Sequence, residues 1–160
     1  MNFKIYVADL AEYNNGNLVG KWLDFNNYSD SSEVEEEIQN MLNKNGNEEF
    51  AIHDYENDLN LEINEYDNVD ELFDIYELCD DDENLVKAII EIHGSEELVN
   101  IGNYYLLYDI DDEYDVGEYY AEFLELCETT ERYFNYKSFG RDILMDGGSW
   151  LTDFGLLCEQ

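Results

Sequence analysis

Negative charge is spread evenly along this chain, and any fold that the chain adopts must tolerate it. The sequence has 41 Asp and Glu residues against 7 Lys and Arg residues, a formal net charge of −34 over 160 residues. The net charge is −11 for residues 1–62, −12 for residues 63–103 and −11 for residues 104–160. An acidic tail would concentrate the charge at one end, so this distribution indicates a negative coat over a whole molecule. Such a coat repels nucleic acid and anionic membranes and attracts basic surfaces.

The amount of charge can be compared with that of duplex DNA. Duplex DNA carries one charge per ~1.7 Å of its axis, so the net charge of −34 matches roughly 58 Å of duplex, or about 17 base pairs. A dimer would match about twice that length. The charge alone therefore suggests a molecule that can stand in for DNA.

The apolar content predicts a folded protein in spite of the charge. Leu, Ile, Val and Phe make up 44 of the 160 residues, which is above the ~20% below which disorder is expected. The chain also has 14 Tyr, 8 Phe and 2 Trp residues, and each aromatic side chain buries a large area. No apolar run approaches the ~18 residues of a membrane span, and the N-terminus lacks a signal-peptide pattern.

The cysteines indicate a reducing compartment. Cys79, Cys127 and Cys158 are odd in number and lack the spacing of metal ligands. We interpret all three as buried structural thiols, and we expect a cytoplasmic protein.

Apolar periodicity in the first third of the chain predicts a small α+β unit. Phe3, Ile5 and Val7 alternate with other residues, as in a strand. Ser32, with Glu35 three residues later, predicts a capping box at a helix start. The pattern predicts, in order, a strand over 3–7, a turn over 13–17, a returning strand over 18–25, a helix from 32 to 45 and a strand over 50–55.

Residues 63–103 differ from the first third and predict several short helices joined by tight turns. Apolar residues recur at helical spacing over 69–79 and over 85–92. Gly94 is expected to end the second of these helices, and Ser95 to start another short one.

Residues 104–160 again mix strand and helix patterns. They predict a strand over 104–110, a helix over 116–127, a short helix over 130–136, and strand-like segments over 143–145 and 150–157. The expected fold class is therefore α+β. It is expected to have three small domains, an α+β domain over 1–62, a helical domain over 63–103 and an α+β domain over 104–160.

Residues for catalysis or for a cofactor are lacking. The chain has only two histidines, His53 and His93, and no glycine-rich phosphate loop or nucleophile motif. We therefore expect no enzyme, no cofactor and no metal. The best rival motif is an EF-hand-like opening over Asp109–Asp115, but the positions that need Gly and Glu hold Tyr114 and Tyr120.

Several short motifs point to a family. The motifs are Tyr6-Val7-Ala8-Asp9-Leu10, Tyr13-Asn14 with Gly16, Gly20-x-Trp22, Ile52-x-Asp54-Tyr55-Glu56, Tyr114-Asp115-Val116 with Tyr119-Tyr120 and Glu122, Asn135-Tyr136, and Gly140-Arg141-Asp142. They span residues 6 to 142, nearly the whole chain. In content and order they resemble the ArdA family of antirestriction proteins.

The resemblance implies a specific shape and activity. Members of the family fold as an elongated, curved chain of three small domains and dimerise through the C-terminal domain. The dimer mimics bent B-form DNA and occupies the DNA-binding groove of Type I restriction–modification enzymes, at the methyltransferase core. Genes of this family travel on mobile genetic elements.

Twenty acids are the candidate DNA-mimic surface, because they lie opposite apolar stripes or in clusters. They are Asp30, Glu33, Glu35, Glu36, Glu37, Asp70, Glu71, Asp74, Glu77, Asp80, Asp81, Asp82, Glu83, Asp111, Asp112, Glu113, Asp115, Glu118, Glu122 and Glu125. Five aromatic residues are assigned to the core or the dimer interface rather than to ligand binding. They are Tyr119, Tyr120, Phe123, Tyr133 and Tyr136.

Two alternatives remain open at this point. The chain could be an acidic chaperone or inhibitor of another basic, nucleic-acid-binding protein. A calcium-binding module is the third hypothesis. The solvated charged face remains the plain interpretation of any single acid on the surface.

Overall fold

The computed structural model describes residues 1–160 and contains two compact units. The N-terminal unit comprises Met1–Asp81 and the C-terminal unit comprises Asp82–Gln160. Each unit holds one three-stranded antiparallel sheet together with helices. The expected mixture of helices and small sheets is confirmed, and the division into three domains stays a prediction.

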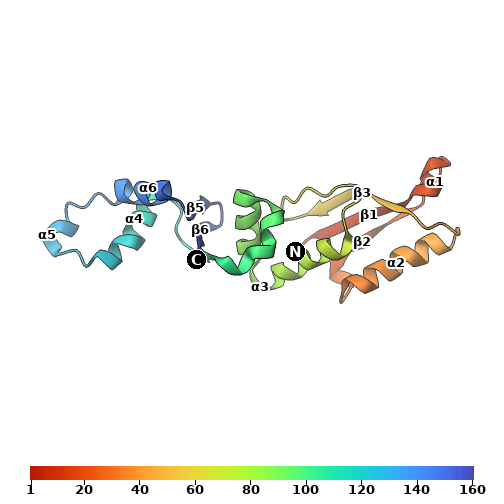
Figure 1. The fold of residues 1–160 in the computed structure, drawn as a ribbon, viewed down its shortest axis with the longest axis horizontal. Helices are drawn as coiled ribbons and strands as arrows, with labels where there is room; N and C mark the ends of the chain where they lie inside the picture. The colour runs from red at the N-terminus through yellow and green to blue at the C-terminus, as the bar shows by residue number, and fades with distance from the viewer. The chain divides into compact units, whose positions relative to one another are not determined.

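The sheet of the N-terminal unit has the strand order β2-β1-β3 (Figure 1). Its elements are β1 (Phe3–Asp9), α1 (Leu10–Asn14), β2 (Gly20–Asp24), the 3₁₀ turn η1 (Phe25–Asn27), α2 (Ser31–Asn43) and β3 (Phe50–Asn57). The predicted hairpin of the first two strands is confirmed, with Ile5 opposite Leu23 and Val7 opposite Lys21.

The core of the N-terminal unit is rich in aromatic side chains. The ring of Phe25 lies 4.9 Å from that of Phe3 and 5.2 Å from that of Phe73. Val34 and Ile38 of α2 are buried, as the helical stripe predicts. Large apolar side chains are thus withdrawn from water while the acids of the same elements stay outside.

Helix α3 (Val69–His93) is interrupted once. Asp82 has φ −155° and ψ 90°, which is extended backbone. The helix therefore consists of a first half that ends at Asp81 and a second half that follows Asp82. The two helical stripes that the sequence predicts over 69–79 and 85–92 correspond to these halves.

The sheet of the C-terminal unit has the strand order β4-β6-β5, and Figure 1 labels β5 and β6. Its further elements are the 3₁₀ segment η2 (Ser95–Asn103), β4 (Tyr104–Leu107), α4 (Glu113–Ala121), η3 (Glu122–Leu124), α5 (Glu128–Glu131), α6 (Tyr136–Asp146), β5 (Ser149–Thr152) and β6 (Gly155–Glu159).

Helices α4 and α6 touch through their backbones. A Cβ atom added at Gly117 would lie 1.9 Å from the carbonyl oxygen of Tyr136. One added at Gly140 would lie 1.9 Å from the carbonyl oxygen of Glu113. No real side chain fits at either position, so these two glycines permit the helix crossing.

Five sequence predictions are wrong in detail. The N-cap of α2 is Asp30, not Ser32, because the carboxylate of Asp30 accepts from the N–H of Glu33 at 3.1 Å. The helix predicted over 130–136 and the strand over 143–145 are replaced by α5 and by α6, which begins at Tyr136. Residues 150–157 form two strands with a turn at 153–154, not one. Cys127 is exposed, whereas Cys79 and Cys158 are buried as expected.

The hydropathy of the helices is low. No helix combines the length and the apolar character that a membrane span requires.

Candidate partner-binding surface

Carboxylates cover the surface of both units. Of the 41 Asp and Glu side chains, 31 are exposed, nine are half-buried and one, Asp9, is buried. The net charge is −19 for residues 1–81 and −15 for residues 82–160. Each unit is therefore strongly anionic by itself.

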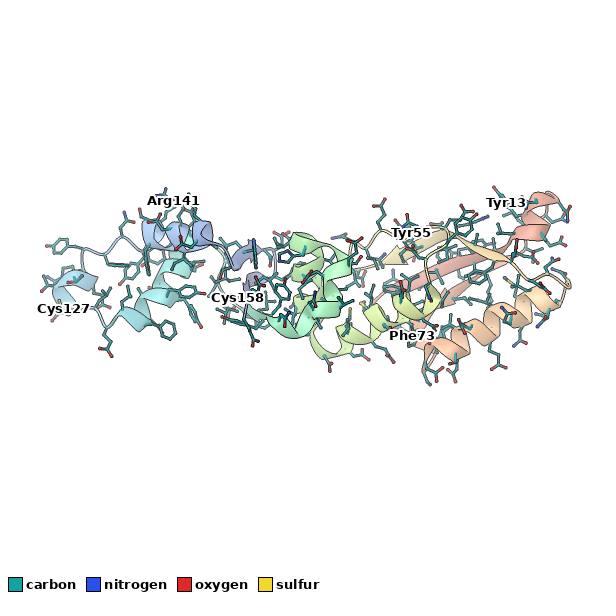
Figure 2. All side chains as sticks on the ribbon, viewed as in Figure 1. Tyr13, Tyr55, Phe73, Cys127, Arg141 and Cys158 are labelled. Carbon is teal, nitrogen blue, oxygen red and sulfur yellow. The ribbon has the colours of Figure 1, made fainter.

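The few basic residues are mostly neutralised within the chain. Five of the seven form ion pairs with acids, namely Lys4, Lys21, Lys87, Arg132 and Lys137. Arg141, which Figure 2 shows on α6, is exposed and has no acid within ion-pair distance. The basic residues that could bind nucleic acid are thus few, scattered and largely paired.

The twenty candidate acids separate into those that bond to the chain itself and those that do not. Fifteen are exposed and five are half-buried. The half-buried five all have partners in the chain: Glu37 with Lys21, Glu83 with Lys87, Glu113 with Lys137, Asp82 with Tyr108, and Asp115 with the N–H groups of Asp111 and Asp112.

Three of the exposed candidates are helix caps or support one. Asp30 and Asp112 accept from the first N–H groups of α2 and α4, and Glu33 accepts from the N–H of Ser29 at 2.8 Å. These hydrogen bonds satisfy backbone donors that a helix start leaves free. The sequence assigned these acids to the binding surface, and the structure places them in local structural roles as well.

Twelve candidates remain exposed and form neither a hydrogen bond nor an ion pair through their side chains. They are Glu35, Glu36, Asp70, Glu71, Asp74, Glu77, Asp80, Asp81, Asp111, Glu118, Glu122 and Glu125. These carboxylates are hydrated and available to a partner.

The densest row of free carboxylates lies on the first half of α3. Six of the twelve fall between Asp70 and Asp81, a stretch of roughly 16 Å at ~1.5 Å per helical residue. That is about one charge per 3 Å of helix axis, close to the ~3.4 Å per charge along one strand of B-form DNA. A face of this helix thus presents negative charge at nearly the linear density of a DNA strand.

A second group of free carboxylates lines a groove in the C-terminal unit. Glu118, Glu122 and Glu125 surround a depression of about 330 Å³, together with Glu131 and Tyr136. The sequence grouped the first three acids, and the structure adds Glu131 from α5.

Sequence reasoning missed the exposed acids of strand β3. Asp54 and Glu56 are exposed, and they alternate with the half-buried residues Tyr55 and Asn57. Figure 2 labels Tyr55 on this strand. The period-two alternation was the available signal, since acids on one face of a strand recur at every second residue.

Asp9 is the one acid withdrawn from the surface. Its carboxylate accepts from the side chain of Asn47 at 2.8 Å, from the N–H of Glu12 at 3.1 Å and from Asn45 at 3.4 Å. Burial acts to raise the pKa of Asp9, but these hydrogen bonds outweigh it and hold the pKa below its ordinary value. Asp9 therefore caps α1 and ties the turn after α2 to the sheet.

The five aromatic candidates fall into two groups. Tyr120 packs against the small core of Ile110, Val116, Leu156 and Cys158, and Tyr119 packs beside it. Phe123 and Tyr133 are 69% and 81% exposed, and Tyr136 is half-buried against Tyr114 and Phe134. Phe123 and Tyr133 thus present apolar surface to solvent.

The EF-hand-like stretch is built differently from a calcium loop. The carboxylates of Asp112 and Asp115 accept from backbone N–H groups in a capping box at the start of α4. No group of three His, Cys, Asp or Glu side chains is arranged to hold a metal ion. These acids form a helix cap.

A comparison with models of protein families shows to which family the chain belongs. The model of the family described as "Antirestriction protein (ArdA)" matches residues 5–157. The chain belongs to the ArdA antirestriction family. A comparison with curated proteins gave no match. Membership assigns an antirestriction function in general, and thus an interaction with restriction–modification enzymes as inhibitor rather than as enzyme.

The ArdA-like motifs have structural roles in this chain. Asp9 is the buried cap, and Gly20 lies where an added Cβ atom would be 2.6 Å from the hydroxyl of Tyr6. The rings of Tyr6 and Trp22 lie 5.5 Å apart, and Gly140 permits the crossing of α4 and α6. The motifs by which the family is recognised therefore maintain the fold, whereas most free carboxylates lie outside them.

Proposed function

We propose that this chain is a mimic of B-form DNA that occupies the DNA-binding groove of Type I restriction–modification enzymes and thereby blocks restriction. The observation that carries the proposal is the set of twelve free, exposed carboxylates, above all the row from Asp70 to Asp81 at nearly the charge density of a DNA strand. Its membership of the ArdA family supports the choice of target.

The mechanism follows from electrostatics. The groove of an enzyme that binds DNA is lined with Lys and Arg side chains that contact phosphates. Carboxylates at similar spacing contact the same side chains and release the counterions held by both surfaces. Because phosphate contacts carry no sequence information, such a mimic inhibits enzymes of different sequence specificity.

The active form in this proposal is a homodimer in the cytoplasm of a bacterial host. One chain matches only about 17 base pairs by charge. The proposed dimer interface lies within residues 104–160 and includes Phe123 and Tyr133, because large exposed aromatic side chains are typical of interface cores. In the proposed dimer each chain has three domains, 1–62, 63–103 and 104–160.

Competition with DNA tests the proposal directly. Purified protein is titrated into a Type I methyltransferase core bound to labelled DNA, at two salt concentrations. We expect displacement of the DNA and a steep loss of affinity with salt. In cells, unmodified phage should plate more efficiently on a Type I restricting strain that expresses the gene. A separate methylation assay shows whether modification is inhibited as well as restriction. Unchanged plating on several Type I systems would contradict the proposal and favour an inhibitor of another basic protein.

Two blocks of substitutions, one on the candidate surface and one outside it, form a test variant and its matched control. Changing Asp80, Asp81, Asp82 and Glu83 together to Asn or Gln removes four charges but keeps the oxygen atoms that accept hydrogen bonds. The variant should fold and compete poorly. The control block changes Glu48, Glu49, Glu62 and Asp146, which are exposed and lie outside the candidate surface, and this variant should compete better than the first.

A further inference from the structure

Helix α3 is broken at one residue by hydrogen bonds rather than by its composition. Residues 69–93 contain neither Gly nor Pro, the two residues that ordinarily interrupt a helix. The break nevertheless falls at Asp82, where the N-terminal unit ends and the C-terminal unit begins. Something other than helix propensity must hold residue 82 in an extended conformation.

The side chain of Asp82 forms two kinds of hydrogen bond in that conformation. Its Oδ1 atom accepts from the N–H of Leu85 at 3.0 Å, which makes Asp82 the N-cap of the second half of α3. Both of its carboxylate oxygens lie within reach of the Tyr108 hydroxyl, at 2.7 and 2.8 Å. The hydrogen bond to Asp82 is the main cause of a raised pKa at Tyr108, which keeps that hydroxyl protonated as donor.

Two further contacts stabilise the start of the second half of α3. Glu83 pairs with Lys87 one turn later, and the Lys87 ammonium lies 5.8 Å from the centre of the Phe154 ring. These contacts keep the second half of α3 in place in the C-terminal unit. Asp82 is the one residue inside α3 whose backbone angles are not helical.

We infer that the hydrogen bond from Tyr108 to Asp82 is a conformational device that holds α3 broken, and that without it α3 becomes continuous from Val69 to His93. We expect the two states to be close in free energy. A mid-helix Asp is only mildly unfavourable, and the broken state is stabilised chiefly by one cap and one tyrosine hydrogen bond.

The inference changes the role of one candidate acid. Asp82 stands among the acids proposed to contact the partner, yet its carboxylate is already used within the chain. It fixes where the row of free carboxylates from Asp70 to Asp81 ends. This step rests on the proposed function, whereas the helix break itself does not.

The test measures the backbone at residue 82 in the full-length chain by NMR. In Tyr108→Phe and in Asp82→Ala, the Cα resonance of residue 82 should move toward helical values. In Tyr108→Phe the hydrogen-exchange rate of the Leu85 amide should also change about fivefold or more in either direction, because its N–H would exchange the Asp82 carboxylate for a backbone carbonyl as acceptor. Tyr13→Phe, at a half-exposed tyrosine of the N-terminal unit, is the matched control and should change neither signal.

Asp82→Asn separates the structural role from partner contact. Asn keeps an oxygen that accepts from Leu85 and from Tyr108, so the break should persist although one charge is lost. Asp81→Asn, one residue earlier, removes a free charge and should weaken competition slightly. An extended residue 82 in both Tyr108→Phe and Asp82→Ala would overturn the inference while leaving the proposed function intact. Failure of every form to compete with DNA would overturn the proposed function alone.

Discussion

The two units of the molecule carry similar negative charge, but each is stabilised internally in a different way. Of the twelve largest fully buried side chains, nine lie in the N-terminal unit, among them Phe3 and Phe25, and three in the C-terminal unit. The C-terminal unit relies instead on the close backbone contact of α4 and α6 at Gly117 and Gly140. Self-repulsion can thus be balanced either by burying large side chains or by bringing backbones together.

Each unit has its own tryptophan, which allows the comparison to be tested. Trp22 lies in β2 of the N-terminal unit, and Trp150 lies in β5 of the C-terminal unit, 4.6 Å from His93. Trp22→Phe and Trp150→Phe provide two full-length backgrounds with a single tryptophan each. Urea unfolding can then be followed separately for each unit.

The largest effect is expected from Phe25→Ala. Phe25 is fully buried and contacts the rings of Phe3, Phe73 and Tyr76. Removing it should lower the free energy of unfolding of the N-terminal unit by ~3–5 kcal/mol. The midpoint reported by Trp22 should fall while that reported by Trp150 stays. Equal falls at both tryptophans would show that the two units unfold as one.

Gly140→Ala should have the next largest effect on stability. It should destabilise the C-terminal unit and leave the N-terminal unit unchanged. The added methyl group would overlap the carbonyl of Glu113, so α4 and α6 must separate at a cost of about 3 kcal/mol. The midpoint reported by Trp150 should fall and that reported by Trp22 should not. Gly102→Ala is the control, since an added Cβ there meets nothing within 4 Å. A stable Gly140→Ala variant would refute the helix-crossing explanation.

Asp9→Asn tests the buried acid and its pH dependence. The pKa of Asp9 is lower in the folded chain, so its stabilisation is present above the unfolded pKa of ~3.9 and is lost as pH falls through the folded pKa. At pH 7 the variant should lose ~1–2 kcal/mol in the N-terminal unit. The difference from the parent chain should shrink below about pH 4. A difference that stays constant into acid would mean that the carboxylate charge contributes nothing.

The smallest effect is expected from Glu77→Gln. Glu77 is exposed and forms no hydrogen bond or ion pair through its side chain, so both unfolding midpoints should stay within about 0.5 kcal/mol of the parent. Competition with DNA should weaken only slightly, because many similar contacts share the binding. Loss of nearly all inhibition from this one change, or a flat salt response, would exclude a distributed mimic.

Much of the fold and of the charged surface could be predicted from the sequence. Apolar alternation located β1, β2 and β3, and helical stripes located α2 and both halves of α3. Exposure of the acids followed as well, since an ionised carboxylate is costly to bury. The uniform charge and the ordered short motifs also led to the ArdA family, which the family match confirms.

The tertiary structure alone decided which acids are free. Asp82 and Glu77 look alike in the sequence, yet Asp82 accepts from Tyr108, 26 residues later, and Glu77 faces water. Likewise, Asp9 is buried because Asn45 and Asn47 meet it from the turn after α2. Nothing in the sequence marks Gly117 and Gly140 as special, because their role arises only where α4 and α6 cross. Periodicity reports the face that a residue occupies, whereas a hydrogen-bond partner or a close backbone depends on chain segments brought together by folding.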